Sequence, residues 1–300
     1  MTELIDWQHD LAGVRIGAGT NVVIRDMVAA GLPEKRTNDV EPAGEDGLRP
    51  GADQYGGRLV RIDCGIRCVG DAAAALDLLA ELQEHADPDG VRLLAGETVE
   101  LTLKYPGREP RTLRGRLRKC EETQEDAVHG WIPLDIEFLA TDPLFYGEME
   151  QRQIPLGALS RGGFVAPVVA PVVTAAVPTD QLPKSVANPG TAPTWPVLRV
   201  NGPCVNPVIT HMESDRSLAL DVALLAGQWI EIDTRPGWRT VLDDAGASRA
   251  VLLRWGDRID EFDLPPGINH LKFEATDPTN TAQLTVTWWP AWKTLKKESL

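Results

Sequence analysis

The fold of this chain is indicated most clearly by its last third, which begins with Asn188-Pro-Gly-Thr-Ala-Pro-Thr-Trp-Pro-Val-Leu-Arg-Val-Asn-Gly202. Short apolar runs follow at regular spacing and end with Leu284-Thr-Val-Thr-Trp-Trp-Pro-Ala-Trp292. In His270-Leu-Lys-Phe-Glu274 the apolar residues alternate with polar ones, which is typical of antiparallel strands that bury one face. We therefore predict a β-sandwich over residues 188–300.

The strands of this sandwich are separated by clusters of glycine, proline, asparagine or aspartate. We expect them at Val197–Val200, Val208–His211, Ser217–Leu220, Ile230–Asp233, Thr240–Leu242, Val251–Arg254, Asn269–Glu274 and Ala282–Trp289. The spacing alone does not distinguish a sugar-binding module from a scaffold.

The first half of the chain has the pattern of an α+β domain, predicted over residues 1–148. Strands are expected at Leu4–Trp7, Val22–Ile24 and Leu59–Cys64, and residues 41–54 read as a loop rich in proline, glycine and acids. Asp71 is a good N-cap for a helix over Ala72–His85. Ala75, Leu78, Leu79 and Leu82 would form its apolar face. The fold class is thus mainly β with one α-helix.

A hairpin is predicted after this helix, because apolar and polar residues alternate over residues 99–104 and 113–118. Its second strand places Arg114, Arg116 and Arg118 on one face, within reach of Glu100 across the hairpin. These four residues are candidate contacts between subunits. A solvated face is the alternative. A nucleic-acid surface is disfavoured because no aromatic residues interleave with the arginines.

Residues 149–187 are interpreted as a connector that packs on the sandwich. The stretch Gly162-Gly-Phe-Val-Ala-Pro-Val-Val-Ala-Pro-Val-Val173 is apolar but broken by prolines, so it suits neither a central strand nor a helix. A free linker is seldom this apolar.

The composition excludes several classes of protein. No apolar run approaches the roughly 18–20 residues that span a bilayer, and Met1–Asp6 lacks the features of a signal peptide, so we expect synthesis in a cytoplasm. Four scattered cysteines and five dispersed histidines show no metal-ligand spacing. Acids such as Asp243, Asp244 and Asp260 lie beside turn residues, where solvated acids are normal. No nucleophile elbow or phosphate loop occurs, so we expect no enzyme, metal or cofactor.

The negative charge is concentrated in the first half. Residues 1–150 hold 16 Lys and Arg against 29 Asp and Glu, whereas residues 151–300 hold 14 against 15. Such a first domain would repel a phosphate backbone rather than bind it. A surface that serves only solubility is the other interpretation.

Several segments resemble, in their order, the distal tail proteins of siphophages. The most specific are Trp229-Ile-Glu-Ile-Asp-Thr234 and the turn Pro266-Gly-Ile-Asn269, and Trp195–Gly202 and Asn206–Thr210 agree with them. Phe138-Leu-Ala-Thr-Asp-Pro-Leu-Phe-Tyr146 is similar to the end of that family's N-terminal belt domain. Gly31–Pro33 and Asp46-Gly47 lie where the family has an early loop. The resemblance is firmest over residues 188–292.

The resemblance implies a virion protein of the phage tail tip, assembled in the host cytoplasm. In this family a belt domain closes into a hexameric ring, and galectin-like sandwiches lie outside it. The ring would join the tail tube protein on one side to the tail-tip hub protein on the other. DNA would pass through the ring without specific binding, and no membrane partner is implied. The implied lumen is expected to be acidic, with acids from residues 34–53 and 121–137.

The alternative function is a carbohydrate-binding module that attaches to host cell-surface glycans. Seven of the nine tryptophans fall in residues 188–300, and exposed aromatic faces are what sugar sites use. Trp238, Trp255 and Trp289 are the candidate exposed aromatics. Alternation would bury several of the others, where indoles contribute large apolar area. The sequence leaves open the host, the neighbouring tail proteins, the ring size and which acids face a lumen.

Overall fold

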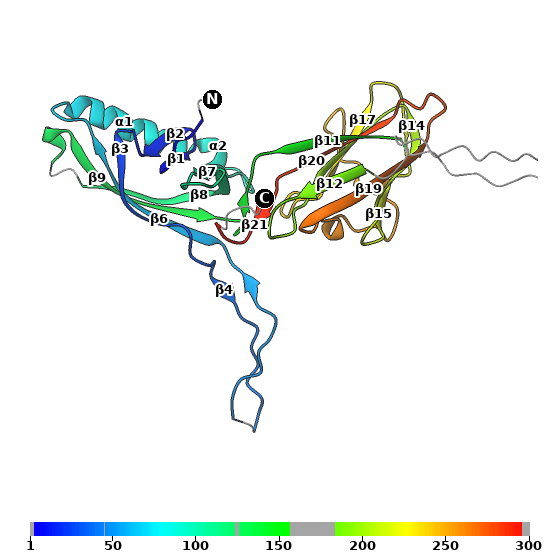
Figure 1. Ribbon diagram of the computed structural model, residues 1–300, viewed down its shortest axis with the longest axis horizontal. Coiled ribbons are helices and arrows are strands. Elements are labelled where there is room, and N and C mark those ends of the chain that lie inside the picture. Colours follow the sequence, from blue (N-terminus) through cyan, green and yellow to red (C-terminus); the bar gives the residue numbers. More distant parts are fainter. Residues whose placement is uncertain (1–2, 45, 124–125, 157–183, 296–300) are drawn as a thin grey trace, which may run out of the picture. The chain divides into compact units, whose positions relative to one another are not determined.

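The computed structural model describes residues 3–44, 46–123, 126–156 and 184–295. The chain divides into two compact units, one of residues 1–148 with 292–300 and the other of residues 149–291. The first unit therefore contains both ends of the chain, and the second unit is inserted between them. The predicted fold class is confirmed, because strands dominate both units and α1 is the one long helix of the described residues (Figure 1).

The first unit is built on one large antiparallel sheet with the strand order β2-β1-β7-β8-β9-β6-β3. The strands are β1 (Gln8–Leu11), β2 (Val14–Gly17), β3 (Val22–Val28), β6 (Arg58–Arg67), β7 (Val99–Leu103), β8 (Arg111–Glu122) and β9 (Trp131–Ala140). The short β10 (Phe145–Tyr146) pairs with β8 through Tyr146 and Thr112. Two short helical turns, α2 (Asp89–Arg92) and η1 (Ala127–His129), complete the unit apart from a two-stranded arm.

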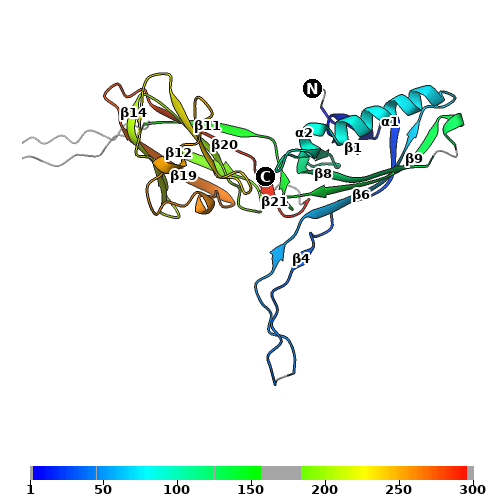
Figure 2. The same cartoon turned by 180° about the vertical axis from the view of Figure 1, so that it is seen from behind.

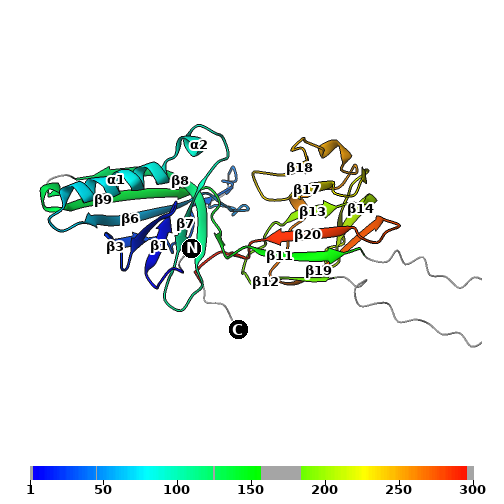
Figure 3. The same ribbon diagram turned by 90° about the horizontal axis from the view of Figure 1, so that it is seen from above.

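Helix α1 (Ala72–Ala86) covers one face of this sheet (Figure 3). The predicted cap is confirmed, because the Asp71 carboxylate accepts the backbone N–H of Ala74 at 2.9 Å. Ala75, Leu79 and Leu82 are buried against Ile62, Ile132, Ile136 and other inward residues of the sheet. Cys64 lies in the same core, and burial raises the pKa of its thiol to about 12.

The second unit is a sandwich of two antiparallel sheets. One sheet has the order β11-β20-β13-β17-β18 and the other β12-β19-β14-β15, with β16 beside β14. Their strands are β11 (Glu150–Pro155), β12 (Lys184–Asn188), β13 (Val197–Asn201), β14 (Cys204–His211), β15 (Arg216–Ala219), β16 (Ala223–Leu224), β17 (Trp229–Asp233), β18 (Thr240–Asp243), β19 (Gly267–Thr276) and β20 (Gln283–Trp288). Leu198, Ile232, Phe273 and Val286 are among the side chains that fill the space between the sheets.

Two expected strands are wrong. The chain at Leu4–Trp7 is not a strand, because Trp7 adopts a φ of +65° and β1 begins only at Gln8. The stretch expected as a strand at Val251–Arg254 instead begins within the 3₁₀ turn η3 (Ala250–Leu252), followed by η4 (Ile259–Glu261). In this stretch only an isolated bridge joins Leu253 to Leu220. The other predicted sandwich strands are present with ends that differ by a few residues.

The domain limits also differ from those expected. Residues 150–155 and 184–188, assigned to the connector or its end, are the strands β11 and β12 and pair with β20 and β19. Ile154 and Val186 are buried in the sandwich core. At the other end, β21 (Ala291–Trp292) marks the return of the chain, and Trp292 belongs to the core of the first unit. The apolar stretch 162–173 lies outside the described residues.

Candidate interaction surfaces

The described residues form no group of three or more His, Cys, Asp or Glu placed to hold a metal ion. No helix among them is long and apolar enough to cross a membrane. The arginine row of β8 is the first candidate interaction surface. The register places Glu100 opposite Arg114, and Arg114 Nε donates to Glu100 Oε1 at 3.2 Å. This contact lies within one chain, across the hairpin of β7 and β8.

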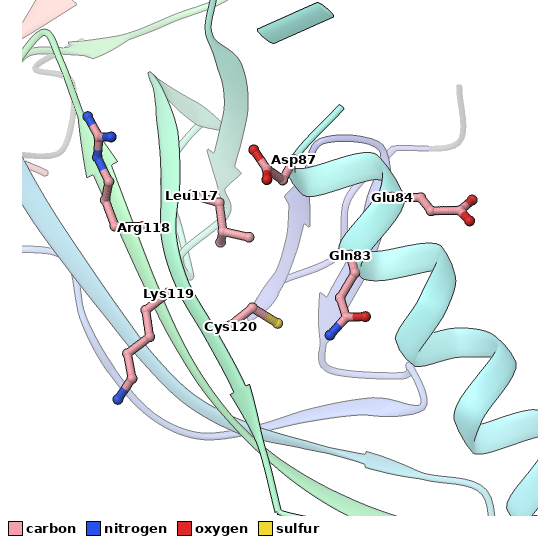
Figure 4. Close-up of a pocket in the computed structure, with 7 residues that line it drawn as sticks. All are labelled: Gln83, Glu84, Asp87, Leu117, Arg118, Lys119 and Cys120. Atoms are coloured by element: carbon pink, nitrogen blue, oxygen red, sulfur yellow. The ribbon is translucent and has the colours of Figure 1, made fainter. Parts of the chain in front are cut away.

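The other two arginines differ in their surroundings. Arg116 donates to the backbone oxygens of Glu97 at 2.8 Å and Leu94 at 2.5 Å, so its guanidinium closes the loop before β7. Arg118 is exposed and sits in a β-bulge, where the register with β9 shifts between Leu117 and Lys119. Leu117 and Cys120 point toward α1, whereas Arg118 and Lys119 both point away from it (Figure 4).

A shallow groove of about 490 Å³ lies between α1 and this bulge. Leu117 and Cys120 form its apolar part, and it is also lined by Gln83, Glu84, Asp87, Arg118 and Lys119 (Figure 4).

The sheet face opposite α1 carries ion pairs that link neighbouring strands. Arg25 on β3 pairs with Asp63 on β6, and Arg61 on β6 pairs with Glu137 on β9 at 3.3 Å. Lys119 on β8 contacts both Asp135 at 2.7 Å and Glu121 at 3.0 Å, which raises its pKa to above the usual range. Such solvent-exposed pairs add little to stability, because water and salt screen them. Together these pairs neutralise much of the acidic charge of Asp63, Asp135 and Glu137 on this face.

A two-stranded arm is the feature that sequence reasoning missed. Residues 31–44 and 46–57 form a long hairpin in which β4 (Lys35–Arg36) pairs with β5 (Gln54–Tyr55), and Val40 bridges to Arg49 (Figures 1 and 2). Nearly every described arm residue is exposed, including the apolar Leu32, Val40, Leu48 and Tyr55. Its strands are too short and too polar to show a period of two, so the segment read as a loop.

The base of the arm is fixed by the buried Arg58. Its guanidinium donates to the backbone oxygens of Ala29 and Gly31 at the start of the arm and of Pro143 at 3.0 Å. It also lies 4.3 Å above the ring of Phe145 and donates to the Lys293 oxygen at 3.2 Å. Burial lowers the pKa of Arg58 from its usual value. One side chain therefore ties the arm to the end of the first unit.

The three candidate aromatics of the second unit differ in exposure. Trp255 is 98% exposed and Trp238 is 49% exposed, whereas Trp289 is half-buried. Arg235 lies between Trp238 and Trp289, with its guanidinium 5.4 and 4.9 Å from their rings. The same guanidinium forms a bidentate ion pair with Asp233, through Nε to Oδ1 and Nη2 to Oδ2. This contact occupies aromatic surface that a sugar ring would need at Trp238 and Trp289.

The clustered acids of the second unit are held as anions. Hydrogen bonds from the Ala247 backbone and from Arg249 keep the pKa of Asp243 below its usual range. Arg258 lowers the pKa of Asp260 in the same way, and Asp263 pairs with Arg216. A glycosidase needs one carboxyl group whose pKa is raised so that it can donate a proton. Neither Asp243 nor Asp260 has a raised pKa of this kind.

Comparison with known proteins gives the relatives of the chain. Residues 189–292 match the family model of the siphovirus-type tail component, C-terminal domain. A crystal structure of SPP1 Dit (gp 19.1), described as a paradigm of the hub adsorption apparatus in phages that infect Gram-positive bacteria, is similar with a TM-score of 0.60 at 14% identity. The likeness covers 95% of this chain and 98% of that one.

A chain of the phage P2 baseplate, in its activated conformation with Ca, is similar with a TM-score of 0.54 at 11% identity, over 90% of this chain and 91% of that one. The P2 baseplate with Sr gives a TM-score of 0.53. No protein of curated function matches the sequence.

Proposed function

We propose, from the match of residues 189–292 to the family model of the siphovirus-type tail component, that the chain is a structural subunit of a phage tail tip. In this role it forms a ring, of six subunits by our proposal, between the tail tube and the tip. The first unit builds the ring and the second is a galectin-like domain outside it. The role is structural rather than catalytic, and the place of the protein is the virion.

The observation that carries this proposal is the extent of the structural likeness. The likeness to SPP1 Dit covers 95% of this chain, so it extends over both units. The family model reaches only the second unit, and the likeness extends the argument to the first. Sugar binding is supported less well, because Arg235 already occupies two of the three candidate aromatics.

The arm fits a subunit that is completed by neighbours. Ordering a residue costs about 1–2 kcal/mol in backbone entropy, and residues 31–57 place few side chains in a core to offset it. The exposed Leu32, Val40, Leu48 and Tyr55 would gain burial against another subunit or an adjoining tail protein. The buried Arg58 fixes the direction of the arm, which lowers the cost of docking it.

The ion pairs opposite α1 fit a surface that DNA passes without binding. Lys119, Arg61 and Arg25 are basic groups of this face that are each held by an acid of the adjoining strand, whereas Arg118, which also points away from α1, is exposed. Asp135 and Glu137, expected to give the lumen an acidic wall, are therefore partly neutralised. We propose that the excess negative charge of the first unit repels the DNA backbone and so keeps DNA from binding in the lumen. A gel shift of duplex DNA at near-physiological salt would contradict this.

The experiment that tests the proposed function locates the chain in the particle. Antibodies raised against residues 184–295 should label the distal end of purified tails in electron images. Antibodies against the major tube protein are the matched control and should label the whole length. Label along the tube, on the capsid, or on no part of the particle would show that the proposed function is wrong.

A further inference from the structure

A buried histidine of the second unit contacts an exposed serine at the tip of a hairpin. His211 ends β14 and is 1% exposed, and its ring lies edge-on to that of the buried Phe262, with 6.3 Å between centroids. Residues 212–215 form the turn to β15, and Asp215 has a φ of +54°, in the left-handed region that tight turns use. Ser214 is exposed in this turn, and its Oγ lies 2.6 Å from Nδ1 of His211. An exposed serine is therefore hydrogen-bonded to an imidazole that is closed to solvent.

The hydrogen bonds around Asn269 fix which nitrogen of His211 carries the proton. The Nδ2 atom of this buried amide donates to the backbone oxygens of Pro265 at 3.0 Å and Gly267 at 3.2 Å, so its Oδ1 is an acceptor. This Oδ1 lies 3.0 Å from Nε2 of His211, and the hydrogen is therefore assigned to Nε2. In the neutral ring Nδ1 keeps its lone pair and accepts the hydroxyl of Ser214.

Ser214, His211 and Asn269 have the geometry of a nucleophile, a base and a group that orients the base. Such sets are recognised by hydrogen bonds of about 2.6–3.2 Å from the nucleophile to the base, with the base in turn held by a third group. The two distances here are 2.6 Å and 3.0 Å. A serine hydroxyl is a weak nucleophile until a base takes its proton during the attack. His211 is placed to take that proton.

A carboxylate lies beside the ring and stabilises the imidazolium that forms when His211 takes a proton. Glu213 Oε2 is 3.4 Å from Nε2 of His211. The Glu213 carboxylate is fixed by β19, because the backbone N–H of His270 donates to it at 3.0 Å and Nδ1 of the same residue contacts it at 2.6 Å. Arg216, the residue opposite His211 on β15, pairs with Asp263 at 3.1 Å, so its charge is already balanced.

From this geometry we infer that Ser214 is an activated nucleophile that accepts an acyl group from an activated ester or thioester. Ser214 Oγ bonds to the carbonyl carbon of the donor while its proton passes to Nδ1 of His211. The bond from that carbon to the leaving oxygen or sulfur breaks, and the leaving group departs with its electron pair and regains the proton. Residues 212–216 are all exposed, so the turn does not enclose a substrate and suits a donor that is itself activated.

The product is an ester on Ser214, formed once per chain without any change of redox state. This reactivity is a property of the second unit and does not depend on the place of the chain in a particle. It adds a modification site to the structural role and does not replace that role.

The test treats the full chain with p-nitrophenyl acetate and, in a second arm, with a fluorophosphonate probe, and locates the adducts by peptide mass spectrometry. In the second arm Ser214 Oγ bonds to phosphorus and fluoride leaves. The matched control is Ser248, an exposed serine of the same unit. We expect labelling at Ser214 at least about 100-fold faster than at Ser248, because general-base assistance contributes a factor of about 100 or more. Ser214→Ala should lose this adduct, and Ser248→Ala should keep it.

Two measurements show whether His211 activates the serine or only holds the turn. His211→Gln should slow the labelling of Ser214 at least about 100-fold, with folding checked by its melting temperature. In urea that unfolds the wild-type chain, Ser214 and Ser248 should react at similar rates, a comparison that holds even if the variant does not fold. Equal labelling of the two serines in the folded chain, or undiminished labelling of Ser214 in folded His211→Gln, would overturn the inference.

Discussion

The guanidinium of Arg111 stacks on the ring of Trp292 at 3.4 Å, so the last part of the chain completes the core of the first unit. Both side chains are buried. A Cβ atom on Gly147 would lie 2.9 Å from the same ring, which leaves room only for glycine there. Arg58 and Arg108 reinforce the contact by donating to the backbone oxygens of Lys293 and Leu295. The first unit is therefore incomplete until synthesis of the chain has passed residue 292.

Trp292→Ala should destabilise the first unit by about 3–5 kcal/mol, because it removes a buried indole and leaves Arg111 without its stacking partner. The second unit should keep its stability. Hydrogen exchange, which reports each unit separately, is the measurement. Trp255→Ala removes an indole that is 98% exposed and should leave both units unchanged. Equal protection of the first unit in the two variants would contradict the role assigned to Trp292.

Arg58→Met should cost about 2–4 kcal/mol, because it leaves buried carbonyl oxygens of the arm base and of Lys293 without their donor. The matched control is Arg61→Met on the same strand, which breaks only the exposed pair with Glu137 and should cost less than about 1 kcal/mol. Chemical denaturation gives both values. Limited proteolysis should cut near residues 29–31 faster in the first variant only. Similar losses in the two variants would argue against Arg58 as the fixing residue.

The stability of the first unit should fall as the pH drops from about 6.5 to 4, because His9 must stay neutral in the folded state. Its Nδ1 accepts the Lys104 backbone N–H at 3.1 Å, and burial lowers its pKa to about 4. In the unfolded chain the pKa of His9 is near 6.5, so between pH 6.5 and 4 the unfolded state binds more protons than the folded state. The contribution of neutral His9 to stability is therefore fully present above pH 6.5 and is lost toward pH 4. The loss amounts to about 3 kcal/mol at most.

His9→Asn is the control for this prediction, because an amide oxygen can accept the same hydrogen bond but does not titrate. Carboxylates add to the acid sensitivity of both proteins, so the difference in unfolding free energy between them isolates His9. That difference should be constant above pH 6.5. Below pH 6.5 the protein with His9 should lose stability relative to the His9→Asn variant. Parallel curves from pH 7 to 4 would show that His9 titrates normally.

A fragment of residues 149–291 should fold alone, whereas residues 188–300 should not form a stable sandwich. The shorter fragment lacks β11 and most of β12, which exposes the edges of β20 and β19 and removes Ile154 and Val186 from the core. It also carries Trp292 away from its core. Calorimetry should show one cooperative transition for residues 149–291 only. A cooperative transition of the same size in both fragments would show that β11 and β12 are dispensable.

The sequence predicts the parts of this fold that rest on local patterns. Asp71 caps α1 as expected, and alternation located β13, β14, β17 and β19 within a few residues. The arm was missed because β4 and β5 are two residues each, and their partners are defined only by the pairing of Lys35 with Tyr55 and Arg36 with Gln54. Trp292 was placed in the wrong unit because its position depends on Arg111, a contact that no local pattern reveals.

The candidate site was predicted only in part, for a related reason. The sequence pointed to Arg114 and to its cross-strand partner Glu100, because register follows from alternation. It did not show that Arg116 binds backbone oxygens, or that a bulge turns Lys119 to the same side as Arg118. Trp255 was a candidate from composition, but the exposure of Val251 depends on the chain leaving the sheet at η3.

The mass of the assembly tests the central claim most directly. The full chain, isolated from purified tails under non-denaturing conditions, should give a native mass of six subunits, each of 32.7 kDa, and electron images should show a ring with a central channel. A monomer at all concentrations, together with purified tails that contain no such ring, would contradict the account.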